Sequence, residues 1–282
     1  MNTPPAELVN PSVRRGPFRA VLFDFDGTLS LIREGWARVM VGMMVERLRE
    51  QMLAREPESE LWSHLDRLVM AQNGAPTIRQ MEVFVEEVRR RGGMPADSWD
   101  YLRQYIDRLM EMVRGRWHVL ETGQAQPADW AVPGVHALLG NLRDRQLPLF
   151  VASGTEYDHV AHEAQILRVN EFFPSGINAP KNNDPTFRKA NVIARLLGEL
   201  GIRGEELLSF GDGMVETAEV KRVGGVAVGV ASSEYGSGVG VVNATKRATL
   251  IDAGADLIIP DYACQEELVS WLWAPEKLKV ES

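Results

Sequence analysis

The sequence contains little of what several classes of protein require. Its single cysteine, Cys264, excludes a disulfide within the chain and suits a reducing compartment. The most apolar stretch, Val223 to Ala231, has only nine residues, three of them glycine, so no segment is long enough to cross a bilayer. The first 17 residues hold four prolines and lack the apolar run of a signal peptide. We therefore expect a soluble, cytoplasmic protein without a membrane partner.

The sequence also lacks a basic region. Its net charge is −8, with no run of lysine or arginine, which argues against nucleic acid as a partner. A small anionic substrate is compatible with this charge, because its pocket needs only a few well-placed basic residues. At 282 residues, the chain can form one large domain, two modest ones, or one architecture with an insertion. No pattern specifies an oligomeric state.

One short stretch, Ala20 to Leu29, carries a strong signal. Four apolar residues precede Asp24, Asp26 and a glycine-containing turn, as expected for a buried strand that presents side chains at its C-terminal end. In open α/β sheets, ligands bind at this end.

The pair Asp24 and Asp26 allows more than one interpretation. A calcium loop beginning at Asp24 would need Gly at its sixth and Glu at its twelfth position, but Leu29 and Gly35 stand there. Two interpretations remain: a polar turn, or a nucleophilic carboxylate beside a metal, with the second aspartate acting as acid and base.

Periodicity divides the rest of the chain into two kinds of segment. Apolar residues at i, i+3 and i+4 predict helices over 36–53, 61–71, 78–88 and 99–113. Helices then alternate with strands; the helices are expected at 135–142, 157–167, 187–201, 215–223, 246–253 and 265–273, and the strands at 148–152, 176–178, 207–210, 226–230 and 257–259. Alternation predicts an α/β fold, a parallel sheet with helices on both faces, in which the first helical block is an insertion.

The predicted organisation is a flexible lead-in (1–17), an α/β core (18–30 and 130–273), a helical insertion (31–129) and a C-terminal tail (274–282).

Polar residues follow two further predicted strands of the core. Ser153-Gly154-Thr155 offers a hydroxyl and a backbone that a ligand can approach. Gly211-Asp212-Gly213 is followed by Glu216, four residues after Asp212. Acidic groups at two strand ends and a hydroxyl at a third describe a small pocket for a divalent cation and a phosphate.

Such a pocket concentrates negative charge, so a cation from the protein is expected beside the phosphate. Two lysines are candidates: Lys181 in a loop, and Lys189 in the first turn of the next predicted helix. A lysine in a first helical turn is slightly disfavoured by the helix dipole, which indicates another role for it.

These residues together resemble the haloacid dehalogenase superfamily of phosphohydrolases. Its four motifs are found in order: DxDGT at Asp24 to Thr28, the hydroxyl at Ser153, a lysine, and GDxxx(D/E) at Gly211 to Glu216. The resemblance covers roughly residues 18–30 and 130–262. It implies a Rossmann-like core with an inserted all-helical cap domain.

The resemblance also implies a magnesium-dependent phosphatase for a small phosphorylated metabolite. Asp24 would be the nucleophile that forms an aspartyl-phosphate, and Asp26 would protonate the leaving oxygen and then activate water. Thr28 would help to hold the loop, while the Ser153 hydroxyl and the Gly154 amide would bind phosphoryl oxygens.

Magnesium would be held by an Asp24 oxygen, the backbone carbonyl of Asp26 and Asp212, with Glu216 nearby. The lysine would screen charge between nucleophile and phosphate.

The spacing of the lysine, at the start of the helix before the acidic strand, resembles the phosphoserine phosphatase branch and favours Lys189. Lys181 resembles the loop lysine of phosphoglycolate phosphatase relatives and stays the alternative. Glu216 stands where many members have Asp, and Asp26 is intact, whereas the dehalogenases of the superfamily lack this acid.

A cap would close over the pocket, exclude water and contact the leaving group. Arg33 is the best candidate in the cap to bind a substrate anion; the more ordinary interpretation is an arginine on a solvated helix face. Two other functions stay open: a phosphomutase that shares the aspartyl-phosphate, and a non-catalytic protein that binds a phosphometabolite. Binding alone does not need a nucleophile and its acid, which argues against the last.

Overall fold

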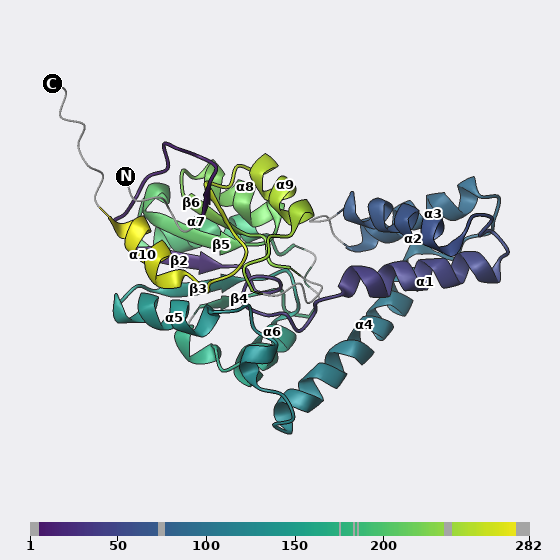
Figure 1. Cartoon of the computed structure of the whole chain (residues 1–282), viewed down its shortest axis with the longest axis horizontal. Helices are drawn as coiled ribbons and strands as arrows, with labels where there is room; N and C mark the ends of the chain where they lie inside the picture. The colour runs from purple at the N-terminus through teal and green to yellow at the C-terminus, as the bar shows by residue number, and fades with distance from the viewer. Residues whose placement is uncertain are drawn as a thin grey trace. The chain divides into compact units, whose positions relative to one another are not determined.

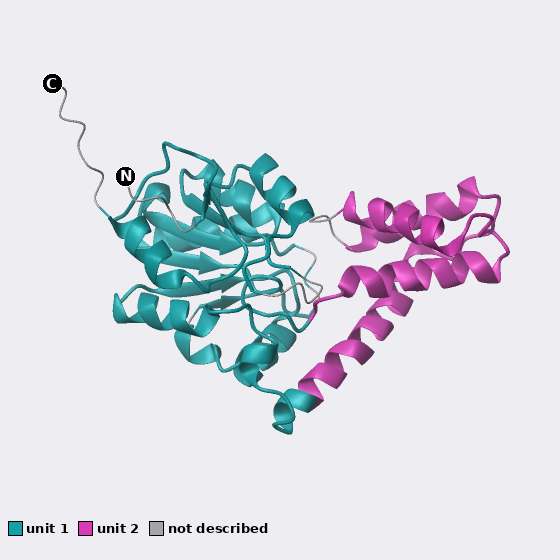
Figure 2. Ribbon diagram, in the orientation of Figure 1, with its two compact units in different colours: residues 1–32, 119–282 teal, residues 33–118 magenta. Residues whose placement is uncertain are grey.

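The computed structural model describes residues 6–72, 77–174, 176–182, 184, 186–233 and 239–274. The chain divides into two compact units, one of residues 1–32 and 119–282 and the other of residues 33–118 (Figure 2). The division at residue 118 falls inside helix α4 (Ser98–Glu121), so the second unit is shorter than the insertion predicted over 31–129. No helix among the described residues is both long and apolar enough to span a membrane.

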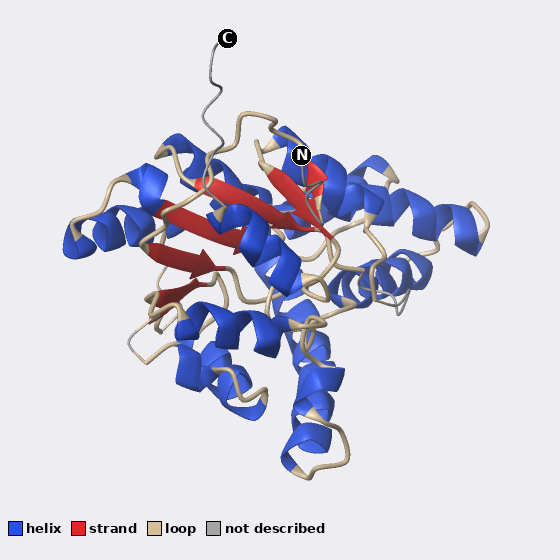
Figure 3. Cartoon of the chain, turned by 60° about the vertical axis from the view of Figure 1, so that its left-hand side comes forward, coloured by secondary structure: helices blue, strands red, loops and turns tan. Residues whose placement is uncertain are grey.

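In its described residues, the first unit contains a sheet of seven strands (Figures 1 and 3). The order of its strands is β1-β7-β6-β5-β2-β3-β4. Every pair of neighbours is parallel except β1 with β7. The strands are β1 (Glu7–Leu8), β2 (Ala20–Phe23), β3 (Leu149–Ala152), β4 (Ile177–Asn178), β5 (Leu207–Gly211), β6 (Val226–Val230) and β7 (Leu257–Ile259). The predicted α/β fold with a mostly parallel sheet is confirmed.

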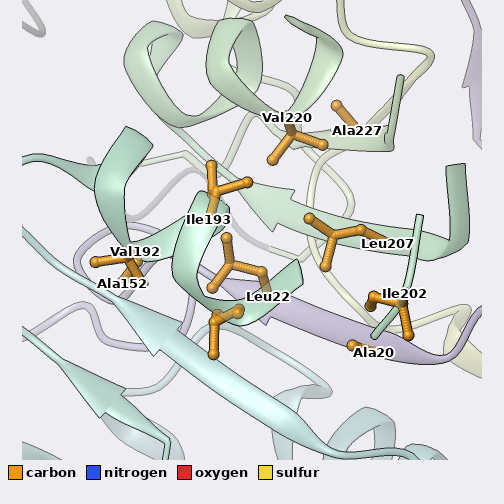
Figure 4. Close-up of a cluster of buried hydrophobic side chains, with 10 residues drawn as sticks. Ala20, Leu22, Ala152, Val192, Ile193, Ile202, Leu207, Val220 and Ala227 are labelled. Atoms are coloured by element: carbon orange, nitrogen blue, oxygen red, sulfur yellow. The ribbon is translucent and has the colours of Figure 1, made fainter. Parts of the chain in front are cut away.

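Helices cover both faces of this sheet, as Figure 3 shows. On one face, Ile193 of α7 and Val220 of α8 pack against Leu22 and Leu207 (Figure 4). On the other, the ring of Phe210 stacks on that of Phe23 with a centroid separation of 5.1 Å. The helices of this unit are α5 (Val135–Asp144), α6 (Tyr157–Ile166), α7 (Lys189–Leu200), α8 (Met214–Arg222), α9 (Ala244–Asp252) and α10 (Gln265–Trp273).

Strand β2 lies in the middle of the sheet, between β5 and β3. All four of its residues are buried, as expected for a parallel strand covered on both faces. The register aligns Phe23 with Val151 on one side and with Phe210 on the other. Since these strands run in the same direction, the residues that follow them gather at one edge of the sheet.

The short strand β1 was not predicted. Residues 1–17 were expected to form a flexible lead-in, but Glu7 pairs with Ile258 and Leu8 with Leu257. Strand β7 would otherwise be the edge of the sheet, and an edge strand has unpaired backbone groups that an antiparallel segment can satisfy. A salt bridge between Glu7 and Arg247 adds to this attachment.

The second unit is all helical in the residues that the structure describes. Its helices are α1 (Trp36–Glu50), α2 (Glu58–Met70), α3 (Thr77–Arg90) and most of α4. The buried Glu87 of α3 accepts hydrogen bonds from Arg90 and Arg91, and it pairs with His64 of α2 at 2.9 Å. These bonds hold the pKa of Glu87 below its usual value, although burial opposes them. A buried charge with several partners therefore links α2 to α3.

Candidate active site

Asp24 directly follows the central strand β2. Its Oδ1 accepts hydrogen bonds from the backbone N–H of Phe25 at 2.8 Å and from Lys189 Nζ at 2.8 Å. Its side chain is only 11% exposed. Burial raises the pKa of Asp24 to about 7, and Lys189 opposes this rise. Asp24 is thus a nearly buried carboxylate whose ionised form depends on a neighbouring cation.

Lys189 is the first residue of α7, in agreement with its predicted place in a first helical turn. Its Nζ lies 2.8 Å from Asp24 Oδ1 and 3.0 Å from Glu216 Oε2. Burial alone would lower the pKa of Lys189, but the two carboxylates outweigh it and raise that pKa. Lys181, the alternative, is exposed, and its ammonium lies over the ring of Tyr157, 4.2 Å from the centroid. Of the two candidates, Lys189 is the lysine that contacts Asp24.

Three carboxylates gather beside Lys189. One oxygen from each of Asp24, Asp212 and Glu216 lies within 4.8 Å of the other two, and we call these residues the acidic centre. Glu216 is buried, and its Oε1 accepts a hydrogen bond of 2.6 Å from the backbone N–H of Gly213. A Cβ at Gly213 would approach Glu216 Oε1 to 2.8 Å, so a side chain there would displace the Glu216 carboxylate. The grouping of hard oxygen ligands fits a divalent cation such as magnesium.

Asp26 and the residues after β3 form the next part of the site. Asp26 Oδ2 accepts a hydrogen bond of 2.6 Å from Thr155 Oγ1, and Ser153 Oγ accepts one of 3.0 Å from the backbone N–H of Thr155. Gly154 between them is exposed. Thr28 is fully buried, and its Oγ1 has no hydrogen-bond partner in the described part of the chain.

Two residues of this region were not predicted as site residues. Thr155 was part of the quoted hydroxyl motif, but nothing in the sequence linked it to Asp26, 129 positions away. Lys246 was predicted only as the start of a helix; its Nζ lies 2.7 Å from Asp212 Oδ2. No sequence signal identifies Lys246, because the contact depends on how α9 packs beside the ends of β5 and β6.

Gly27 lies against Lys246. Its φ is +73°, a conformation that favours glycine, and a Cβ there would approach Asp212 Oδ2 to 2.0 Å and Lys246 Nζ to 2.9 Å. The glycine of the DxDGT sequence is therefore required for two reasons, its backbone conformation and the close approach of Asp212.

Arg33 belongs to the other unit, residues 33–118. Its Nη1 lies 4.0 Å from the sulfur of Met110, which is in the same unit. Its contact with a substrate anion stays a prediction.

Comparisons with known proteins agree with this fold. A family model described as haloacid dehalogenase-like hydrolase matches residues 18–224. Comparison with curated protein sequences gives no significant match. The chain therefore belongs to the haloacid dehalogenase-like hydrolases, the family that its four sequence motifs resemble.

Several solved structures share the fold. A predicted phosphoglycolate phosphatase from Haemophilus somnus has a TM-score of 0.59 at 16% identity, covering 89% of this chain and 97% of its own. A hydrolase of the same family from Deinococcus radiodurans, with bound phosphate and sodium, has a TM-score of 0.59 at 16% identity, covering 91% and 96%. A protein from Thermotoga maritima assigned as a beta-phosphoglucomutase has a TM-score of 0.53 at 17% identity, covering 89% and 97%.

Proposed function

We propose that this protein is a magnesium-dependent phosphatase that hydrolyses a small phosphorylated metabolite through an aspartyl-phosphate on Asp24. The observation that carries the proposal is the double ion pair of Lys189 with Asp24 and Glu216. It combines, at the end of the central strand, a carboxylate nucleophile, a cation for the phosphoryl group and acidic ligands for a metal. A protein that only bound a phosphate would not need a buried carboxylate beside its cation.

The acidic centre supports the choice of magnesium. Asp24, Asp212 and Glu216 supply carboxylate oxygens within 4.8 Å of one another, and the backbone carbonyl of Asp26 would be a further ligand. When bound, the metal would neutralise charge on the phosphoryl oxygens.

In the first step, a carboxylate oxygen of Asp24 attacks phosphorus and the bond from phosphorus to the leaving oxygen breaks. Asp26 gives its proton to that leaving oxygen. The hydrogen bond from Thr155 supports this role, since it holds Asp26 Oδ2 in one orientation. Lys189, the Ser153 hydroxyl and the Gly154 amide bind the phosphoryl oxygens.

In the second step, Asp26, now ionised, takes a proton from water, whose oxygen attacks phosphorus. The bond between phosphorus and the Asp24 oxygen breaks, which releases inorganic phosphate and restores both carboxyl groups. Residues 33–118 would form the cap that limits access of water and contacts the leaving group, with Arg33 as the candidate ligand of a substrate anion.

Two of the solved structures named above are described as a predicted phosphoglycolate phosphatase and as a beta-phosphoglucomutase. A phosphatase and a phosphomutase that both form an aspartyl-phosphate differ in whether water or a second hydroxyl accepts the phosphoryl group. The intact acid Asp26 suits both, so accumulation of inorganic phosphate is what separates them.

The test is phosphate release from a panel of phosphorylated small molecules, sugar phosphates and phosphorylated carboxylic acids included, with magnesium. We expect the wild type to release phosphate and Asp24→Asn to lose at least about a thousandfold in kcat. Asp144→Asn is the matched control, since Asp144 is 80% exposed on α5. Conversion of a substrate to an isomer without free phosphate would indicate a mutase, and full activity in Asp24→Asn would refute the mechanism.

A further inference from the structure

Lys246 is a buried lysine to which the proposed reaction gives no role. Its side chain is 6% exposed, and its Nζ lies 2.7 Å from Asp212 Oδ2 and 3.2 Å from Ser232 Oγ. A buried ammonium group is costly unless it is paired and hydrogen-bonded, and these partners meet that requirement. The pair therefore belongs to the interior of the site and is not a solvated surface contact.

The position of Lys246 is fixed from two directions. Lys246 lies in the first turn of α9, where the side chain of Asn243 accepts hydrogen bonds from the backbone N–H groups of Thr245 and Lys246, both at 3.0 Å. Ser232, which follows β6, donates from its hydroxyl to the backbone carbonyl of Gly27 at 2.8 Å. A chain of polar contacts thus joins α9, the end of β6 and the loop that carries the nucleophile.

This chain of contacts ends on one member of the acidic centre. Of the three carboxylates, Glu216 is oriented by the backbone N–H of Gly213, and Asp24 by that of Phe25. Asp212 accepts a hydrogen bond of 2.7 Å from Lys246 Nζ through its Oδ2. The absent Cβ of Gly27 leaves room for this pair.

We propose that Lys246 is a positioning residue that fixes the Asp212 carboxylate so that the acidic centre can bind a divalent cation. Groups that hydrogen-bond to a metal-binding carboxylate set its orientation, and their loss weakens metal binding. This inference rests on the proposed function, because it assigns Asp212 to the metal. The inference predicts that loss of Lys246 weakens metal binding. Simple electrostatics predicts the opposite, because loss of a positive charge near a cation site would by itself strengthen cation binding.

The experiment is calorimetric titration of the metal-free protein with Mg²⁺, and with Mn²⁺ as a second probe. For Lys246→Met, which keeps most of the length of the side chain but removes its charge and donors, we expect affinity about 10- to 100-fold weaker than in the wild type. Lys221→Met is the matched control, because Lys221 pairs with Asp256 at 2.7 Å and makes none of the contacts of the acidic centre. Its metal affinity should equal that of the wild type.

Unchanged or tighter binding by Lys246→Met would overturn the proposal. If this variant does not fold, Lys246→Gln decides, since the shorter, uncharged side chain loses the contact with Asp212 Oδ2 but keeps a polar group in the site; weaker binding supports the proposal and wild-type affinity overturns it. Phosphate release is measured separately on the wild type. Metal binding that depends on Lys246 without any phosphate release would refute the proposed function alone, whereas turnover with metal binding independent of Lys246 would refute this inference alone.

Discussion

Replacement of Lys189 by methionine tests the assignment of the active-site cation. Lys189→Met keeps most of the length of the side chain and removes its charge, which leaves Asp24 and Glu216 without the ammonium group that lies 2.8 and 3.0 Å from them. At an effective dielectric constant of about 20, each contact represents about 5 to 6 kcal/mol of gross attraction, before desolvation is subtracted. Removal of one partner of a buried ion pair costs about 3–5 kcal/mol in stability.

The effect on activity follows from the same contacts. Without Lys189, the phosphoryl group loses a cation that stabilises the transition state, so kcat should fall at least about a hundredfold. Because Lys189 opposes the burial that raises the pKa of Asp24, that pKa should rise further above about 7. The acidic limb of the profile of kcat/KM against pH then moves to higher pH.

Lys181→Met is the matched control for this experiment. The ammonium of Lys181 interacts with the ring of Tyr157, a contact that is worth about 0.5–1 kcal/mol at an exposed site. Phosphate release and thermal unfolding are measured for both variants. We expect Lys181→Met to stay within about twofold of wild-type kcat. Loss of activity in Lys181→Met with activity retained in Lys189→Met would refute the assignment.

Two further predictions concern polar contacts in each unit. Thr155→Val removes the hydrogen bond of 2.6 Å that orients Asp26. A hydrogen bond between neutral groups contributes about 0.5–1.5 kcal/mol, so kcat should fall about two- to tenfold, whereas Thr155→Ser should retain activity. Equal activity of both variants would contradict the role of this hydroxyl. Glu87→Gln should lower the free energy of unfolding by about 1–3 kcal/mol at pH 7, while Glu86→Gln, at an exposed salt bridge, should change it by less than about 1 kcal/mol. The pKa of Glu87 is lowered in the folded state, so its stabilisation is present above the unfolded-state value of 4.5 and is lost as the pH falls below it. Chemical denaturation across this pH range checks the sign, and a difference that grows towards low pH would contradict it.

Much of the core could be predicted because its signals are local. The run Ala20 to Phe23 predicted a buried strand, and β2 occupies those four residues. Asp24 and Asp212 could be predicted to approach each other because each follows a parallel strand, and parallel strands bring their C-terminal ends to one edge.

What the sequence could not predict depends on contacts between distant segments. The pairing of Lys246 with Asp212 joins residues 34 positions apart, and it depends on where α9 packs and on the missing Cβ of Gly27. The strand β1 has two residues, too few for a periodic pattern, and it exists only because β7 offers an edge. Helix boundaries shifted for a related reason: α7 begins at Lys189, not at Phe187, since apolar periodicity marks a buried face and not a first turn.

The central claim is that Asp24 carries the phosphoryl group. The most direct measurement is mass spectrometry of the protein after acid quench during turnover of the best substrate from the phosphate-release panel. We expect a peptide that contains Asp24 to gain the mass of one phosphoryl group, and we expect that gain to disappear in Asp24→Asn. Turnover without any phosphorylated peptide, or with the phosphoryl group on another residue, would contradict the account.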